Sequence, residues 1–108
     1  MEIFRDRNGV VVEHDALCRV RGHAYTIIHG DTKTEFSFQL GAVGDVGVNG
    51  PTNEALLSIL IHRTRWLNNL FPCDQNEAAI QHMQEALMWF EERTRDRVRR
   101  GTEGRPEA

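Results

Sequence analysis

The sequence predicts an α+β protein, in which a small antiparallel β-sheet is followed by an antiparallel helical hairpin. The first half contains short apolar runs separated by turn residues, which is the pattern of strands. From Pro51 onward the apolar residues recur with the 3.6-residue period of a helix. Only three or four residues separate the two helical segments, so these segments are expected to pack antiparallel. At 108 residues, the chain has room for one modest core.

Two β-hairpins are expected in the first half. Asn8-Gly9 lies between apolar runs and predicts a two-residue turn, because both turn positions favour positive φ. Gly30-Asp31 predicts the turn of the second hairpin. The strand that follows is expected to alternate, with one face formed by Thr34, Phe36, Phe38 and Leu40 and the other by Glu35, Ser37 and Gln39.

A glycine-rich stretch, GAVGDVGVNGP, joins the two halves and has a glycine at every third position from Gly41 to Gly50. Phosphate-binding loops also precede helices, but the Gly-Lys-Ser/Thr that completes them is missing, so a flexible linker is the favoured interpretation. The expected organisation is a sheet with its linker (1–50), a helical hairpin (51–101) and a polar tail (102–108).

The first helix is expected to begin after an N-cap at Thr52 and to end near Leu70, because a residue preceding proline avoids the helical region. Its predicted apolar stripe consists of Leu56, Leu60, Leu67 and Leu70. Further apolar residues make the first half of the helix apolar nearly all round: Leu57, Ile59 and Ile61. One partner helix cannot cover that circumference, so the sheet or another subunit must cover the rest.

The second helix is expected to begin with Asp74 as its cap and Glu77 completing a capping box. Gly101 is expected to terminate it. The predicted core stripe of this helix consists of Ile80, Met83, Leu87, Phe90 and Val98.

Composition excludes several classes of function. The formal net charge of -3 argues against a general DNA-binding domain, and no apolar run approaches the about 20 residues of a membrane span. Cys18 and Cys73 form no CxxC pair and none of the five histidines lies in a metal-binding motif, so no metal or cofactor is expected. No nucleophile elbow or acid–base pair is evident. We therefore expect a protein that is not an enzyme and has no catalytic residues.

The run EERTRDRVRRG places five of the twelve arginines within eleven residues. At 100° per residue, one narrow face contains Trp89, Arg93, Arg97 and Arg100, whereas Arg95 and Arg99 point elsewhere. Such a row suits a planar phosphorylated ligand, since guanidinium groups fork onto phosphate oxygens. On spacing alone, the favoured interpretation is a solvated helix end, which the helix macrodipole and surface ion pairs stabilise.

Four segments resemble the helical-hairpin domain of the phage anti-Thoeris and anti-CBASS sponge family: TNEALL, PCDQN, EALMW and RTRDRVRRGTEG, which together span roughly residues 49 to 104. The strand-rich first half looks more like the anti-Thoeris type. The resemblance implies a non-catalytic protein of the infected host's cytoplasm that sequesters a cyclic nucleotide immune signal. That signal is glycocyclic ADP-ribose (gcADPR) for the anti-Thoeris type, with cyclic oligonucleotides for relatives.

The resemblance also implies four ligand-binding residues. The family's stacking aromatic falls on Trp66, the asparagine of the connection is Asn76, and the arginines of the terminal motif are Arg93 and Arg97. Trp66 departs from the phenylalanine expected there and enlarges the stacking surface. The alternatives are a small phage regulator that grips nucleic acid with its arginine row, and an assembly module without a ligand.

Self-association is expected from the length of the second helix. Asn76 and Arg93 are seventeen residues apart, which corresponds to about 25 Å of helix and exceeds the span of a compact cyclic nucleotide. Two hairpins packed antiparallel about a two-fold axis would bring the opposite ends together and create two equivalent pockets. The resemblance allows a homodimer or a higher oligomer, up to a hexamer.

Overall fold

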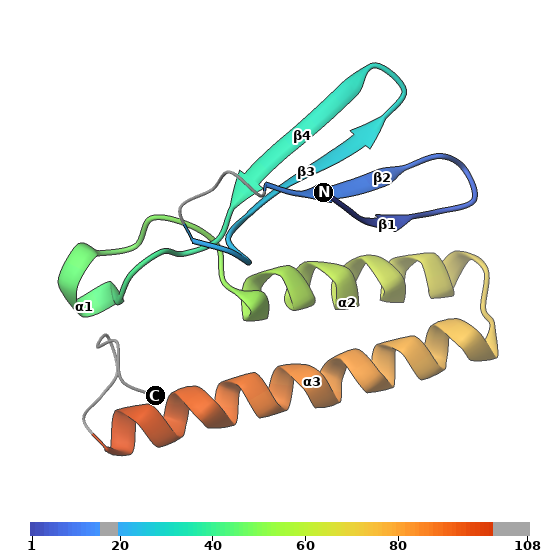
Figure 1. Cartoon of the computed structure of the whole chain (residues 1–108). Helices are drawn as coiled ribbons and strands as arrows, with labels where there is room; N and C mark the ends of the chain where they lie inside the picture. Colours follow the sequence, from blue (N-terminus) through green and yellow to red (C-terminus); the bar gives the residue numbers. More distant parts are fainter. Residues whose placement is uncertain (16–19, 101–108) are drawn as a thin grey trace. The chain divides into compact units, whose positions relative to one another are not determined.

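The computed structural model describes residues 1–15 and 20–100 and divides into two compact units, Met1–Leu40 and Gly41–Ala108. The described part of the first unit forms a β-sheet, and that of the second is helical (Figure 1). The predicted α+β class, with an antiparallel sheet preceding a helical hairpin, is therefore confirmed. Within the described residues no helix is both long and apolar enough to cross a bilayer.

The sheet is an antiparallel meander whose strand order follows the chain. Its strands are β1 (Glu2–Arg5), β2 (Val11–His14), β3 (Ala24–His29) and β4 (Thr32–Ser37). An aromatic cluster lies on one face, where the Tyr25 ring stacks 6.0 Å from Phe36 and lies 5.4 Å from the His14 ring. Val11 is buried on the other face. The sheet thus has apolar residues on both of its faces.

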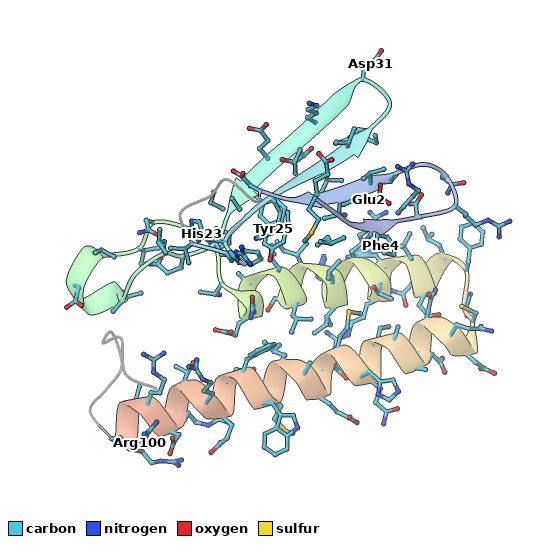
Figure 2. The ribbon with its side chains drawn as sticks, viewed as in Figure 1. Glu2, Phe4, His23, Tyr25, Asp31 and Arg100 are labelled. Atoms are coloured by element: carbon cyan, nitrogen blue, oxygen red, sulfur yellow. The ribbon has the colours of Figure 1, made fainter. Side chains whose placement is uncertain are left out.

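The two hairpin turns differ in how well the sequence predicts them. His29 pairs with Thr32, so Gly30-Asp31 is a two-residue turn as predicted, with Gly30 at φ 57° and Asp31 at its tip (Figure 2). The prediction of a two-residue turn at Asn8-Gly9 is wrong, because Arg5 pairs with Val11 across a longer loop.

The Asp6 carboxylate explains the longer loop between β1 and β2. It accepts hydrogen bonds from the backbone N–H groups of Asn8 and Val10, at 2.8 and 3.0 Å. Gly9 alone in this loop has a positive φ, of 85°. A side-chain acceptor therefore stabilises a wider loop than the Asn-Gly signal predicts.

The glycine-rich stretch is not simply a linker. It contains a single helical turn, α1 (Val43–Val46), which ends at Gly47 with φ 75°. Four residues make too short a helix to offer a phosphate site, so the phosphate-loop interpretation gains no support from it.

Helix α2 (Asn53–Leu70) begins and ends where the sequence predicts. The Thr52 hydroxyl accepts a hydrogen bond from the Ala55 N–H at 3.2 Å, which confirms this residue as the N-cap. At the other end, the Phe71 N–H reaches the Leu67 carbonyl before Pro72 stops the helix.

Helix α3 (Asp74–Arg99) has a different cap from the predicted one. The Cys73 sulfur accepts the Asn76 N–H at 3.4 Å, while the Asn68 side chain accepts the Cys73 N–H at 3.0 Å. Asn68 thereby fixes Cys73 at the cap, and Asp74 becomes the first residue of the helix. The predicted terminator Gly101 and the predicted tail lie outside the described residues.

The two helices pack along a line of half-buried residues, which we call the hairpin seam. Spacings of three and four residues characterise the line on both helices, as in other helix pairs that cross at a small angle. On α2 the seam contains Glu54, Leu57, Ile61, Thr64 and Asn68, and on α3 it contains Asn76, Ile80, Met83, Leu87, Phe90, Thr94 and Arg97. Ile61, only 4% exposed, is its most buried side chain.

The seam corrects two predicted stripes. Three of the predicted leucines on the first helix are exposed instead: Leu60, Leu67 and Leu70. The first half of the helix is apolar nearly all round, so periodicity could not identify the side there that meets α3. Val98 is 56% exposed. Glu54, near the start of α2, lines one groove with Glu91 and Arg95. Val98 therefore lies beyond the part of α3 that α2 covers.

Replacing Ile61 with alanine is expected to destabilise the hairpin by about 2–5 kcal/mol, because buried methyl groups are lost and a cavity remains in the seam. Urea unfolding followed by far-UV circular dichroism measures the loss. Met88→Ala is the control: Met88 is 50% exposed on α3, and its truncation is expected to change stability by less than about 0.5 kcal/mol. Equal losses in the two variants would contradict the importance of the seam.

Candidate ligand-binding site on the helical hairpin

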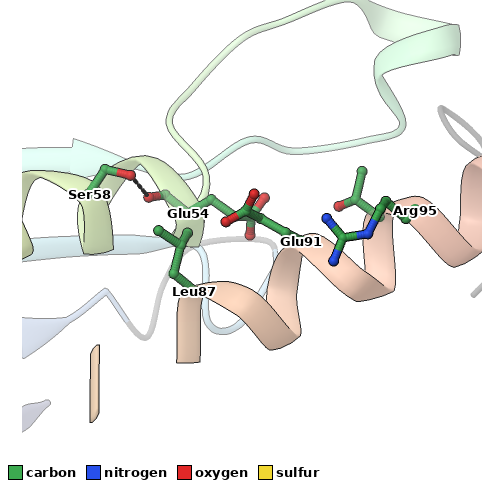
Figure 3. A pocket seen from close by; sticks show the side chains of 6 residues that line it. Glu54, Ser58, Leu87, Glu91 and Arg95 are labelled. Atoms are coloured by element: carbon green, nitrogen blue, oxygen red, sulfur yellow. Dashed lines mark hydrogen bonds between the residues drawn. The ribbon is translucent and has the colours of Figure 1, made fainter. Parts of the chain in front are cut away.

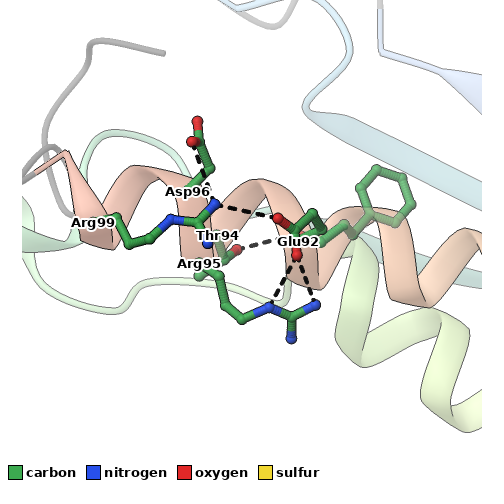
Figure 4. Close-up of polar contacts among 6 residues, drawn as sticks. Glu92, Thr94, Arg95, Asp96 and Arg99 are labelled. Carbon is green, nitrogen blue, oxygen red and sulfur yellow. Dashed lines mark hydrogen bonds and ion pairs between the residues drawn. The ribbon is translucent and has the colours of Figure 1, made fainter.

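The arginine run at the end of α3 contains a network of surface ion pairs (Figure 4). Arg95 and Arg99 donate to the Glu92 carboxylate at 3.0 and 3.3 Å. Arg100 pairs with Asp96 at 3.0 Å, and Arg99 approaches the same carboxylate at 3.6 Å. Glu92 and Asp96 therefore partly neutralise three of the five arginines, including Arg100 of the predicted row.

Arg93 and Arg97 have different surroundings from these three. Across residues 1–15 and 20–100, Arg93 forms no ion pair, and its side chain is exposed. Arg97 is half-buried in the seam, with its Nε atom enclosed. At 100° per residue, these two arginines lie about 100° and 60° from the centre of the α3 seam, on the side away from Arg95. They thus form a basic pair on one side of the hairpin.

A groove lies on the opposite side of the seam, beside Arg95 (Figure 3). It measures about 460 Å³ and is lined by Glu54, Ser58, Leu87, Glu91, Thr94 and Arg95. Ser58 donates to the Glu54 carbonyl at 2.8 Å. The carboxylates of Glu54 and Glu91 would repel a phosphate, so this groove is a poor phosphate site. Sequence reasoning missed it, because only the packing of both helices brings Glu54 and Glu91 together.

Trp66 presents a large aromatic surface, since it is 60% exposed on α2. Its indole N–H donates to Nε2 of His62, one turn earlier, at 3.3 Å. The helical period places Trp66 about 160° from the centre of the α2 seam, so it points away from α3. The side chain is therefore available for stacking rather than committed to the hairpin core.

Asn76 is half-buried in the seam as the third residue of α3. It lies at the connection end of the hairpin, as Trp66 does, but on a different side of it. Arg93 and Arg97 lie near the other end of the same unbroken helix. The helical rise places Arg93 about 25 Å from Asn76. One chain thus does not bring the four sequence-predicted site residues together.

Catalytic and metal-binding arrangements find no support in the described part of the chain. No group of three or more histidine, cysteine, aspartate or glutamate side chains within it could hold a metal ion. The described residues that line the hairpin grooves include no pair of a nucleophile and a histidine base hydrogen-bonded to it.

Comparison with known proteins identifies the hairpin. Residues 30–95 match the model of the Acb2/Tad1 hairpin domain, which covers more than half of the chain. The chain belongs to this family. It is also 45% identical, over 69 residues, to Thoeris anti-defense 1 of Bacillus phage SBSphiJ7. That alignment covers 63% of this chain and 49% of the relative, so the chain matches about half of the relative's length. The predicted family is therefore confirmed.

The ion pairs of Glu92 predict a pH dependence for the end of α3. Hydrogen bonds from Arg95 and Arg99 lower the pKa of the Glu92 carboxyl from 4.5. A carboxyl whose pKa is lowered by folding stabilises the folded state above its unfolded pKa, and this contribution is lost as the pH falls through the folded pKa. Wild-type helicity should therefore exceed that of Glu92→Gln near neutral pH, and the difference should vanish below the lowered pKa.

Circular dichroism across an acid titration measures this difference. Glu91→Gln, which alters the neighbouring carboxyl outside the ion-pair network, is the control and should follow the wild-type curve. An unchanged difference between wild type and Glu92→Gln at acid pH would show that the ion pairs do not stabilise the helix end.

Proposed function

We propose that this protein is a non-catalytic phage anti-Thoeris protein, which binds gcADPR or a close cyclic nucleotide in the cytoplasm of the infected host and withholds it from its effector. Family membership and the similarity to Thoeris anti-defense 1 of Bacillus phage SBSphiJ7 support this proposal. The observation that carries it is the division of the arginine run. Arg95, Arg99 and Arg100 pair with carboxylates, whereas Arg93, beside Arg97, is exposed and has no ion pair with any described residue.

The chemistry of the ligand fits the proposed residues. Arg93 and Arg97 would fork onto the pyrophosphate oxygens of the ligand, since guanidinium groups form bidentate charge-assisted hydrogen bonds. Trp66 would stack on the adenine, an interaction worth about 1–3 kcal/mol. Asn76 would supply a side-chain amide, which can both donate and accept hydrogen bonds.

The proposed pocket is composite. Trp66 and Asn76 lie at the connection end of one hairpin, whereas Arg93 lies about 25 Å and Arg97 about 32 Å from Asn76 along α3. A second copy packed antiparallel would place its arginine end beside the connection end of the first, and two-fold symmetry would create two such pockets. Exposed apolar side chains on α2 provide a surface for this contact, among them Ile59, Leu60, Leu67 and Leu70.

The test of the proposal is recovery of the ligand. The protein is incubated with gcADPR, freed from unbound ligand by gel filtration, and then denatured by heat. Intact gcADPR in the supernatant is the expected result. A cleaved product would show an enzyme, and an empty supernatant would show that gcADPR is not the ligand.

Substitutions in the arginine run should have unequal effects. Arg93→Ala and Arg97→Ala should each weaken gcADPR binding at least about tenfold, because each removes charge-assisted hydrogen bonds to a desolvated phosphate. Arg95→Ala and Arg99→Ala, which change the same net charge at ion-paired positions, should alter it less than about threefold. Isothermal titration calorimetry measures the four affinities.

Equal losses from all four substitutions, with a steep loss of affinity as salt rises, would instead indicate a diffuse electrostatic surface for nucleic acid. That outcome would contradict the pocket.

A mixing experiment tests the composite pocket. Trp66→Ala and Arg93→Ala dimers should each lack an intact pocket. In a mixed dimer, one pocket has both substitutions and the other has neither. Random mixing makes about half of the dimers mixed, so about a quarter of the wild-type number of sites should be restored. Calorimetry before and after the two variants are unfolded and refolded together gives the number of sites. No recovery of tight sites would show that Trp66 and Arg93 do not meet across two copies.

A further inference from the structure

His62 contacts the proposed stacking residue through two kinds of interaction. The Trp66 indole N–H donates to Nε2 of His62 at 3.3 Å. The two rings also meet edge to face, with centroids 6.4 Å apart and planes at 63°. Both residues lie on α2, where a spacing of four residues places side chains on the same side of a helix.

We infer that His62 is a positioning residue for Trp66: its imidazole holds the indole ring in one orientation, ready to stack on a nucleobase. The inference rests on the proposed function and adds to it a residue that does not itself touch the ligand. An exposed tryptophan that samples several rotamers must lose that freedom when a base stacks on it. An indole ring already held by His62 loses less conformational freedom on binding, so the ligand binds more tightly.

The contact requires a particular protonation state of the imidazole. Nε2 accepts the indole hydrogen only when the ring is neutral and carries its proton on Nδ1. The side chain of His62 lines a hollow of about 290 Å³ with Ser58, Ile61, Arg65, Gln84 and Leu87. Arg65 is the charged side chain in that lining. The lining residues from α3, Gln84 and Leu87, carry no charge.

The other histidine on the hairpin provides a matched comparison. His82 on α3 lies 3.9 Å from the Glu85 carboxylate. It makes no ring contact or hydrogen bond with a tryptophan in the described residues. A substitution at His82 therefore removes the same side chain from the same hairpin and leaves Trp66 unaffected.

The experiment compares three replacements of His62. His62→Gln keeps an acceptor, because the amide oxygen can reach an indole one turn away. His62→Phe keeps the edge-to-face contact without an acceptor, and His62→Ala removes both. Calorimetric titration with gcADPR should show wild-type affinity for His62→Gln and His82→Ala, a loss of about two- to tenfold for His62→Phe, and at least that loss for His62→Ala.

A measurement without ligand tests the contact itself. The Trp66 indole N–H gives its own NMR resonance, assigned by comparison with Trp89→Phe. In His62→Phe this resonance should move and exchange faster with solvent, whereas in His62→Gln it should stay near its wild-type position. Each variant is first shown by circular dichroism to retain wild-type helicity, so that unfolding is not the cause.

The outcomes separate this inference from the proposed function. Failure of wild-type protein to bind gcADPR would overturn the proposed function, and the positioning role with it. If wild-type protein binds gcADPR, Trp66→Ala weakens the binding and His62→Phe leaves it unchanged, the positioning role alone would be overturned. Equal losses in His62→Gln and His62→Phe would also overturn it, because they would show that the acceptor does not matter.

Discussion

The hairpin seam between α2 and α3 is the constraint on which the rest of this structure depends. It is a thin interface, in which Ile61 is buried and most other residues are only half-buried. Its spacing of three and four residues makes the two helices run side by side along the whole of α2. The seam therefore separates the two ends of the hairpin, and it decides which side chains of each helix remain available for a ligand or a second copy.

Electrostatics at the end of α3 illustrates why the number of charges is a poor guide to a site. Glu92 and Asp96 lie three or four residues from arginines, so helical spacing alone brings the pairs together. Exposed pairs of this kind stabilise a helix little. Their larger consequence is to lower the effective positive charge around Arg95, Arg99 and Arg100, which makes Arg93 chemically distinct from its neighbours.

The length of α3 is the reason why the proposed pocket is composite. Within one chain, the unbroken helix from Asp74 to Arg99 keeps Asn76 apart from Arg93 and Arg97. The exposed apolar side of α2 has the chemistry of a surface that another element covers, and two-fold packing would satisfy both requirements at once. The contact between His62 and Trp66 needs no second copy, because it forms within one turn of α2.

The sequence by itself determined the features that depend on near neighbours in the chain: the Thr52 cap, the Gly30 turn, the end of α2 before Pro72 and the change from strands to helices. These follow from backbone preferences and local hydrogen bonds. Only the tertiary structure decided which side of α2, apolar nearly all round in its first half, meets α3, and that Val98 is exposed. Each of these depends on a residue distant along the chain or on where a partner helix ends, and periodicity contains no information about either.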